Sequence, residues 1–524
     1  MNTKRVLAVL LLFCLIACQS ASGLNSTSLS ESSALATKPE QAVEQWGVFK
    51  IRLSGPDEGN PFLDVTLSAA FREENGQDAI TVPGFYDGQG MYLIRFSPPR
   101  QGVWTYVTDS NRAELDAKRG SLTAVAPGGS NHGPLRVHKT FHFAYADGTP
   151  YYQTGTTCYA WIHQPAELQE QTLKTLSASP FNKLRMCIFP KRYVYNSNEP
   201  DMFPFVKNDN DTFDFTRFNP AFWRHLENRV MQLGQLGIEA DLVLFHPYDH
   251  WGFADMDDAA DDRYLRYAIA RLSAFRNVWW SLANEWDLMT KPLLKGHRGN
   301  KDMDDWDRFF SILEQDDPFG RMRSIHNCRT FYDHRKPWAT HASIQRGNLQ
   351  EVLTWRQEYQ KPIVVDECGY EGNIPQGWGK LSGPEMVRRF WIGAVCGGYV
   401  GHGETMRHPE DILWWSKGGA LYGESPSRIA FLRTIMETLP YTEMTPARPR
   451  DPVLLSSKPG SVYLVYALES GPITLKLEGQ QNFQVEAIDT WEMKTEVLDT
   501  VGPGEFSVTV LEKDHVLRIM AVQE

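Results

Sequence analysis

Cysteine is scarce in this sequence and too widely spread for a disulfide framework or a zinc site. Of the seven cysteines in 524 residues, Cys14 and Cys18 lie in the N-terminal apolar segment, and the remaining 7 − 2 = 5 include no close CxxC pair. An odd number of cysteines, lying in or beside apolar runs, favours buried free thiols. These five are Cys158, Cys187, Cys328, Cys368 and Cys396.

An excess of positive charge is also missing. The 53 Lys and Arg residues are outnumbered by 64 Asp and Glu residues, so the net charge is −11. This charge argues against nucleic acid or an anionic membrane surface as the main partner, but it leaves room for a local basic pocket. Hydrophobic residues make up 42% of the chain, enough for the two or three domains expected at this length.

The N-terminal apolar run is too short to span a bilayer, but residues 1–18 have the pattern of an export signal. Lys4 and Arg5 precede an apolar stretch over residues 6–16, which Ala17 and Cys18 follow. Residues 15–18, Leu-Ile-Ala-Cys, resemble the bacterial lipobox, which implies cleavage before Cys18 and lipid attachment to it. An ordinary signal peptide is the alternative.

Residues 19–42 are rich in Ser, Thr and Ala with little periodic apolar content, so we expect a flexible tether between anchor and folded body. We therefore expect an exported protein, lipid-anchored to a bacterial membrane on its periplasmic or cell-surface face.

The folded part is predicted to have three domains. Residues 43–130 alternate apolar and polar side chains with period two and are punctuated by Gly, Pro and Asp, which predicts a β-sandwich. The same period returns over residues 445–524, which predicts a second β-sandwich. Between them, residues 141–444 alternate strands with amphipathic helices.

Eight strand-like segments over about 300 residues predict that this middle part is a (β/α)₈ TIM barrel. The clearest unit is residues 219–245, where Asn219 caps a helix, Pro220 begins it and Gly237 ends it before a buried strand. The eight strands are expected at residues 150–155, 182–189, 238–245, 278–283, 322–326, 338–343, 363–366 and 397–401.

Two glutamates follow two of these strands. Glu285 comes after the strand at 278–283 and Glu367 after the strand at 363–366, a separation of 367 − 285 = 82 residues. Parallel barrel strands deliver catalytic groups at their C-terminal ends. Glycoside hydrolysis needs two carboxyl groups, because one protonates the departing oxygen while the other acts from the opposite face of the sugar. A structural ion pair at a strand end is the alternative for each glutamate.

Asn284-Glu285 resembles the Asn-Glu signature after strand four in clan A glycoside hydrolases, the retaining barrel enzymes. The resemblance implies that Glu285 is the acid/base, Glu367 the nucleophile and Asn284 the amide that binds the sugar 2-hydroxyl, with no cofactor. The three-part layout also resembles bacterial candidate glycosidase lipoproteins whose N-terminal sandwich is classed as a domain of unknown function.

Further polar and aromatic residues follow the predicted strands, where barrel loops bind ligands. Asp366 is expected to turn away from the sugar and pair with a cation beneath the rim, since side chains alternate along a strand. A metal site at His246 and His250 is disfavoured because Pro247 opposes the helix that would align them. The residues predicted to contact substrate are Trp161, His246, His250, Trp251, His326, His341, His402, Glu404 and Trp414.

These patterns predict a glycosidase that cleaves O-glycosidic bonds of a poly- or oligosaccharide with retention. Two alternatives are a carbohydrate-binding surface lipoprotein without catalysis and an inverting glycosidase, whose carboxyl groups lie farther apart. Lys191, Arg192 and Arg407 follow strands two and eight and would bind a uronate or sulfate if they converged.

Overall fold

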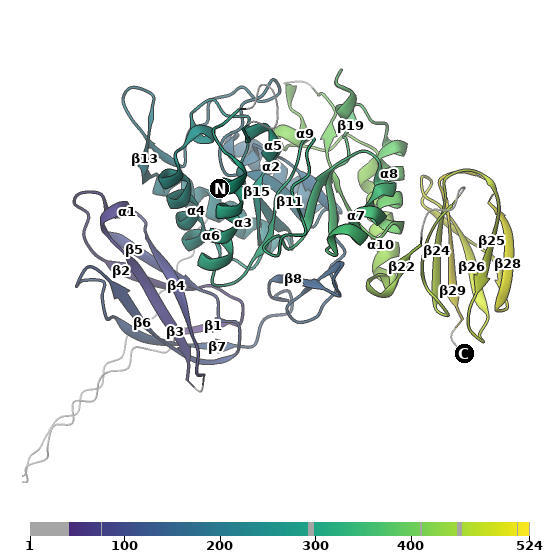
Figure 1. The fold of residues 1–524 in the computed structure, drawn as a ribbon, viewed down its shortest axis with the longest axis horizontal. Helices are drawn as coiled ribbons and strands as arrows, with labels where there is room; N and C mark the ends of the chain where they lie inside the picture. The colour runs from purple at the N-terminus through teal and green to yellow at the C-terminus, as the bar shows by residue number, and fades with distance from the viewer. Residues whose placement is uncertain are drawn as a thin grey trace, which may run out of the picture. The chain divides into compact units, whose positions relative to one another are not determined.

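The computed structural model describes residues 41–74, 76–291, 298–408, 411–447, 453–510 and 512–522. The predicted lipidation site Cys18 and the tether up to residue 40 lie outside these ranges. Residues from Gln41 onward form one compact unit, in which a β domain, a barrel and a second β domain follow one another (Figure 1). Among the helices in the described ranges, none has the length and apolarity needed to cross a bilayer.

The N-terminal β domain is a seven-stranded sheet in the order β1-β7-β6-β3-β4-β5-β2. Strand β4 pairs with β3 through its first part and with β5 from Gly84 onward, so it joins the two halves of the domain. A Cβ at Gly84 would lie 2.6 Å from the Leu67 side chain, so only glycine fits there. The strands are β1 (Gln41–Glu44), β2 (Phe49–Ser54), β3 (Leu67–Glu73), β4 (Ala79–Tyr86), β5 (Met91–Phe96), β6 (Gly102–Ser110) and β7 (Arg119–Val125).

Eight parallel strands form the barrel, in the order β16-β15-β14-β11-β10-β20-β18-β17. A parallel bridge between His326 and Ser343 joins the two ends of this sheet and closes it. The strands are β10 (Gly155–Thr157), β11 (Lys183–Cys187), β14 (Glu239–Phe245), β15 (Val278–Ala283), β16 (Met322–Ser324), β17 (Ala342–Gln345), β18 (Ile363–Glu367) and β20 (Tyr399–His402). The predicted TIM barrel is therefore confirmed.

Two predicted strands were placed too early. The first was expected at residues 150–155 but β10 begins at Gly155, and the sixth was expected at 338–343 but β17 begins at Ala342. The apolar residues before these strands are buried in irregular backbone beneath the barrel, where Tyr151 donates to the Asn182 carbonyl at 2.8 Å. Apolar runs alone do not separate such segments from strands.

Helices follow seven of the eight strands. The predicted cap is present, since the Asn219 side chain accepts from the Ala221 N–H and Pro220 begins α3. The chain from 325 to 341, all of it described, contains no helix between β16 and β17. The helices are α2 (Ala166–Ser177), α3 (Pro220–Gln235), α4 (Asp258–Leu272), α6 (Met303–Asp316), α7 (Val352–Tyr359), α8 (Gly383–Val395) and α10 (Ser425–Thr438), with the hairpin β12 (Phe205–Lys207) and β13 (Phe213–Phe218) before α3.

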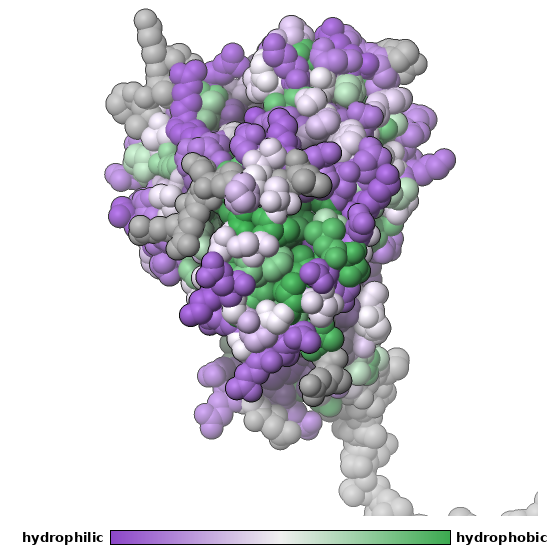
Figure 2. Space-filling view, turned by 90° about the vertical axis from the view of Figure 1, so that its right-hand side faces the viewer, coloured by the Kyte–Doolittle hydropathy of each residue, from purple (hydrophilic) through white to green (hydrophobic). Residues whose placement is uncertain are grey.

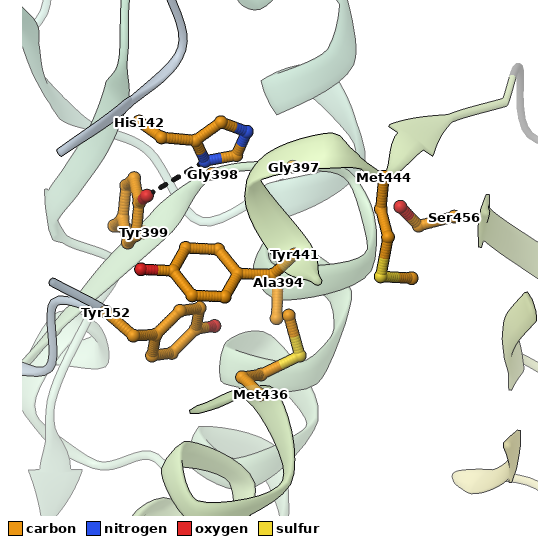
Figure 3. A pocket seen from close by; sticks show the side chains of 10 residues that line it. All are labelled: His142, Tyr152, Ala394, Gly397, Gly398, Tyr399, Met436, Tyr441, Met444 and Ser456. Atoms are coloured by element: carbon orange, nitrogen blue, oxygen red, sulfur yellow. Dashed lines mark hydrogen bonds between the residues drawn. The ribbon is translucent and has the colours of Figure 1, made fainter. Parts of the chain in front are cut away.

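Aromatic side chains close the N-terminal end of the barrel. The hairpin of β8 (Leu135–His138) and β9 (His142–Tyr145) places the Phe143 ring 5.2 Å from both the Trp279 and Tyr399 rings. The cavity beside it is only about 20 Å³, room for about one water molecule. In Figure 3 the Tyr152, Tyr399 and Tyr441 rings gather there, and His142 is hydrogen-bonded to Tyr399. This end of the barrel is therefore filled with side chains.

The C-terminal domain consists of β strands only, in the described ranges after Tyr441–Glu443. Figure 2 looks onto the side of the molecule where this domain lies in Figure 1 and shows a hydrophobic area bordered by hydrophilic side chains. The six-stranded sheet has the order β22-β23-β24-β29-β26-β27, and β25 pairs with β28. The strands are β22 (Thr445–Pro446), β23 (Val453–Lys458), β24 (Val462–Ala467), β25 (Gly471–Leu477), β26 (Phe483–Asp489), β27 (Lys494–Val501), β28 (Gly504–Val510) and β29 (His515–Ala521).

Candidate active site

The two glutamates lie at the C-terminal ends of β15 and β18, with β16 and β17 between these strands in the sheet. Glu367 is the last residue of β18, and Glu285 follows β15 by two residues. Glu285 has φ 55°, a left-handed conformation that costs a non-glycine residue about 1–3 kcal/mol. Both side chains are buried, with 6% and 7% of their surface exposed.

Backbone hydrogen bonds to both neighbouring strands hold Glu285 in this conformation. The N–H of Asn284 donates to the Phe245 carbonyl at 3.0 Å, and the N–H of Trp286 donates to the His326 carbonyl at 3.0 Å. The carboxylate of Asp287 accepts from the N–H groups of Cys328, Arg329 and Thr330 at 2.6–2.8 Å. The short helix α5 (Trp286–Met289) thereby anchors the loop that follows β16.

Tyrosine hydroxyls contact both glutamates. Tyr159, after β10, donates a hydrogen bond to Oε1 of Glu367, and its hydroxyl lies 2.7 Å from Oδ1 of Asn284. Tyr248, after β14, donates to Oε2 of Glu285. Gln345, with its amide nitrogen turned inward, donates to Oε2 of Glu367 at 3.2 Å. The hydroxyl of Tyr159 thus links the nucleophile candidate to the amide beside Glu285.

Burial, and then the charge of Glu367, raise the pKa of Glu285 to about 7. Hydrogen bonding from Tyr248 and the nearby charge of Lys191 act in the opposite direction on this pKa. A carboxyl group with such a pKa is protonated in part of the molecules near neutral pH, so it can act as a general acid.

A buried ionic layer lies beneath the two glutamates. Asp366 points away from the site and pairs with Lys183 at 2.7 Å, the kind of partner that strand alternation predicts for it. Asp241 accepts from Lys183 at 3.0 Å and from Arg185 at 3.3 Å. The second guanidinium nitrogen of Arg185 lies 3.4 Å from Oδ1 of Asn284. Two cations and two anions therefore support Asn284 from below.

The structure places other predicted contact residues in the core. Trp161 is fully buried and donates to the sulfur of Met186 at 2.9 Å, and Trp414 donates to Oγ1 of Thr156 at 2.9 Å. Both predictions of sugar contact are wrong, because these indoles fill the layer between strands and helices. Trp415, the next residue, instead packs against Tyr159 with ring centroids 5.9 Å apart.

Three predicted histidines are also enclosed. His341 precedes β17 and packs on Trp279 and Phe143 at the filled end of the barrel. The ring of His402 stacks on Phe181 at 4.6 Å and lies 3.0 Å from Oγ1 of Thr156. His326 is fully buried, and burial lowers its pKa well below its ordinary value. Contact with sugar is therefore contradicted for His341 and His402, and His326 supports the site through its backbone bonds to Ala283 and Trp286.

Glu404 stabilises the loop before α10 through hydrogen bonds. Its two carboxylate oxygens accept from the N–H groups of Tyr422 and Gly423 at 2.8 Å each, so we correct the prediction of a substrate contact. Close by, Glu371 accepts from the N–H groups of Glu424 and Ser425. Both buried carboxylates therefore hold the entry of α10.

The loop after β14 carries the remaining predicted residues. His246 is buried, and its Nδ1 accepts from the Tyr248 N–H at 3.2 Å, so it supports the tyrosine that contacts Glu285. His250 and Trp251 line an open groove of about 580 Å³, and Trp251 donates to Glu199 at 3.0 Å. Among the described residues no cluster of three or more His, Cys, Asp or Glu side chains could hold a metal ion.

Sequence reasoning missed Tyr159, Tyr248 and Gln345, and it placed Lys191 only in a possible basic cluster. Of the three cations in that cluster, Arg192 is exposed, and Arg407 is 46% exposed and lies 3.6 Å from Asp411. Lys191 is the one of the three that is buried beside the glutamates. In the sequence, these four residues are distinguished only by their position after predicted strands one, two, three and six. Many other residues have such a position.

Two sequence profiles and a crystal structure match this chain. The sequence profile of the apiosidase-like catalytic domain matches residues 138–443, and that of a domain of unknown function, DUF5060, matches residues 42–111. A crystal structure of a candidate glycoside hydrolase from Bacteroides vulgatus ATCC 8482 matches with 38% identity and a TM-score of 0.83, over 92% of this chain and 100% of its own.

A family 5 glycoside hydrolase structure from the same strain has 16% identity and a TM-score of 0.60, over 75% of this chain and 95% of its own, and so supports the fold alone. No curated protein sequence matches this chain. The barrel and its relatives define the protein as a glycoside hydrolase. It belongs to the apiosidase-like family, whose profile covers more than half of its length.

Proposed function

We propose that this glycosidase cleaves an O-glycosidic bond of a poly- or oligosaccharide by double displacement, with retention of anomeric configuration. Glu285 protonates the leaving oxygen while Glu367 attacks the anomeric carbon, so the C–O bond to the leaving group breaks as the glycosyl ester forms. Glu285 then takes a proton from water, which attacks the ester and releases Glu367. Asn284 binds the hydroxyl next to the anomeric carbon.

The observation that carries this proposal is the unequal environment of the two glutamates. Burial and the charge of Glu367 raise the pKa of Glu285 to about 7, whereas Glu367 receives hydrogen bonds from Tyr159 and Gln345. Such a difference suits one residue to proton donation and the other to nucleophilic attack.

The test is hydrolysis by Glu285→Gln and Glu367→Gln. We expect each substitution to lower turnover by about 10²-fold or more, with the melting temperature nearly unchanged. The substrates to screen are 4-nitrophenyl glycosides and plant cell-wall oligosaccharides, including apiose-containing ones because of the family's name. A fully active Glu367→Gln enzyme would refute the double displacement.

Two rival functions make different predictions. A carbohydrate-binding lipoprotein without catalysis would bind glycans equally well with or without Glu285 and would turn none of them over. An inverting glycosidase would release the opposite anomer. The hydrogen bonds that surround both carboxyl groups favour catalysis over mere binding.

We also propose that the protein is exported and carries lipid on Cys18, in agreement with the pattern of residues 1–18. Metabolic labelling with a fatty acid tests this: the wild type should incorporate label and Cys18→Ala should not. Label in both proteins would contradict the anchor.

A further inference from the structure

Lys191 follows β11 and extends its ammonium group into a box of aromatic rings. Its Nζ lies 3.8 Å from the centroid of the Tyr159 ring, 4.3 Å from that of Tyr248 and 4.8 Å from that of Trp415. These rings come from the loops after β10, β14 and β20. Tyr159 contacts Glu367 and Tyr248 contacts Glu285, so the ammonium lies between the two tyrosines that serve the two carboxyl groups.

This ammonium has no hydrogen-bond acceptor among the residues described. Lys191 is only 3% exposed, and the contacts found for Nζ are with ring faces. Cation–π attraction offsets part of the cost of burying the charge, but it leaves three N–H donors without an acceptor. Burial accordingly lowers the pKa of Lys191. A group with unused donors beside a catalytic pair is placed to bind substrate.

The charges around Lys191 indicate what kind of group it binds. The ionisable groups that act on it are Cys187, Glu285, Glu367 and Arg185, and burial raises the pKa of the Cys187 thiol to about 12. Arg185, together with Lys183, is offset by Asp241 and Asp366 in the layer below. The proposed mechanism starts with Glu285 protonated and Glu367 as the attacking carboxylate, so Lys191 and Glu367 then supply one cation and one anion, and the upper layer is neutral.

A sugar bearing a carboxylate or sulfate would add a buried negative charge to this neutral layer. Arg192 and Arg407, the two other cations predicted to bind an acidic sugar, do not neutralise that charge, because Arg192 is exposed and Arg407 lies beside Asp411. A hydroxyl oxygen, by contrast, accepts from the ammonium without changing the net charge.

We propose that Lys191 is a specificity-determining residue that donates a hydrogen bond to a hydroxyl of a neutral sugar held between Glu285 and Glu367. This inference rests on the proposed function of the two glutamates and adds the substrate class. Trp415 and the two tyrosines hold the ammonium in place, so a shorter or bulkier cation does not substitute for it.

The first test is kinetic and uses the full-length protein with a 4-nitrophenyl glycoside of a neutral sugar that the wild type hydrolyses. We expect Lys191→Met and Lys191→Gln to lower kcat/KM by about 10–100-fold, the effect of losing a charge-assisted hydrogen bond. Lys191→Arg should recover little of this loss. The matched control is Lys417→Met, a half-buried lysine on the same face of the barrel, which should retain wild-type kinetics.

The second test separates a bound substrate group from a structural role. Calorimetry compares 1-deoxynojirimycin and 1,4-dideoxy-1,4-imino-D-arabinitol, both protonated, with their uncharged lactams. Removing the Lys191 charge should favour the protonated form, so the ratio of lactam Kd to iminosugar Kd should rise by about tenfold in Lys191→Met. A merely destabilised site would weaken both forms alike and leave the ratio unchanged.

Three results have distinct meanings. Active Glu367→Gln overturns the proposed function. Inactive Glu367→Gln with unchanged kcat/KM in Lys191→Met leaves that function in place and overturns the role of Lys191. A substrate preference for uronic acid glycosides over the matching neutral glycosides, lost in Lys191→Met, overturns the neutral sugar class.

Discussion

The Tyr248 hydroxyl donates a hydrogen bond to Oε2 of Glu285 from the loop after the neighbouring strand β14. This bond stabilises the carboxylate form and so lowers the pKa of Glu285, against the effect of burial. Tyr248→Phe should therefore raise the pKa of Glu285 and move the basic limb of kcat/KM to higher pH. The measurement is the pH dependence of hydrolysis; a limb at the wild-type position would show that the bond does not tune Glu285.

The carboxyl group of Glu285 also determines how kcat/KM of the wild type should depend on pH. Glu285 must be protonated to act as an acid, and its pKa is raised to about 7 by burial and by the charge of Glu367. We expect kcat/KM to fall about tenfold per pH unit above about pH 7. Full activity at pH 9 would show that the proton comes from another group.

The groove at Trp251 predicts a dependence on chain length. Its indole is half-buried and held by Glu199 at 3.0 Å, and the loop that carries it begins at the residues that contact Glu285. Trp251→Ala should lower kcat/KM on an oligosaccharide by about two- to tenfold, since stacking is worth about 0.5–1.5 kcal/mol. It should leave 4-nitrophenyl monosaccharide hydrolysis unchanged. Equal losses on both substrates would place the effect at the catalytic centre instead.

A buried ion cluster joins the N-terminal β domain to the barrel. Arg95 of β5 pairs with Glu227 of α3 at 2.6 Å, and Arg271 of α4 pairs with the same carboxylate at 2.5 Å. Glu227→Gln should reduce the free energy of unfolding by about 3–5 kcal/mol, because buried Arg95 loses its ion-pair partner and Arg271 keeps only the one with Asp87 at 2.8 Å. The control Glu437→Gln breaks the half-exposed pair with Arg433 and should cost under about 1 kcal/mol.

Acid should remove the stability that this cluster contributes. The charges of Arg271 and Arg95 hold the pKa of Glu227 below its ordinary value despite burial. A depressed pKa contributes stability above the unfolded-state pKa, about 4.3, and this contribution is lost as the pH falls through the folded-state pKa. Denaturant titrations of wild type and Glu227→Gln should therefore converge as the pH falls below about 4. A constant difference down to pH 2 would contradict the ion pairing.

The barrel and its two glutamates could be predicted because the signals are local and repeat. The strands that carry the two glutamates are buried and largely apolar; Glu367 ends β18 and Glu285 lies two residues beyond β15. The neighbours Trp414 and Trp415 show where this reasoning stops. One indole is buried against Thr156 and the other faces Tyr159, and only the backbone of the short helix Trp414–Lys417 decides which.

Long-range contacts account for the remaining errors. Nothing near Tyr159 in the sequence indicates that its hydroxyl meets a carboxylate 208 residues away. Likewise, Glu404 follows a barrel strand, where a sugar-binding residue would be expected. Its carboxylate instead accepts hydrogen bonds from the N–H groups of residues 422 and 423. Such pairings depend on how the loops of different strands meet, which periodicity does not encode.

The most direct test of the account is proton NMR of the sugar released in the first minutes of hydrolysis, before mutarotation. Double displacement through Glu367 predicts that the first product has the same anomeric configuration as the substrate. A first product of the opposite configuration would contradict it and would assign both glutamates to a single inverting step.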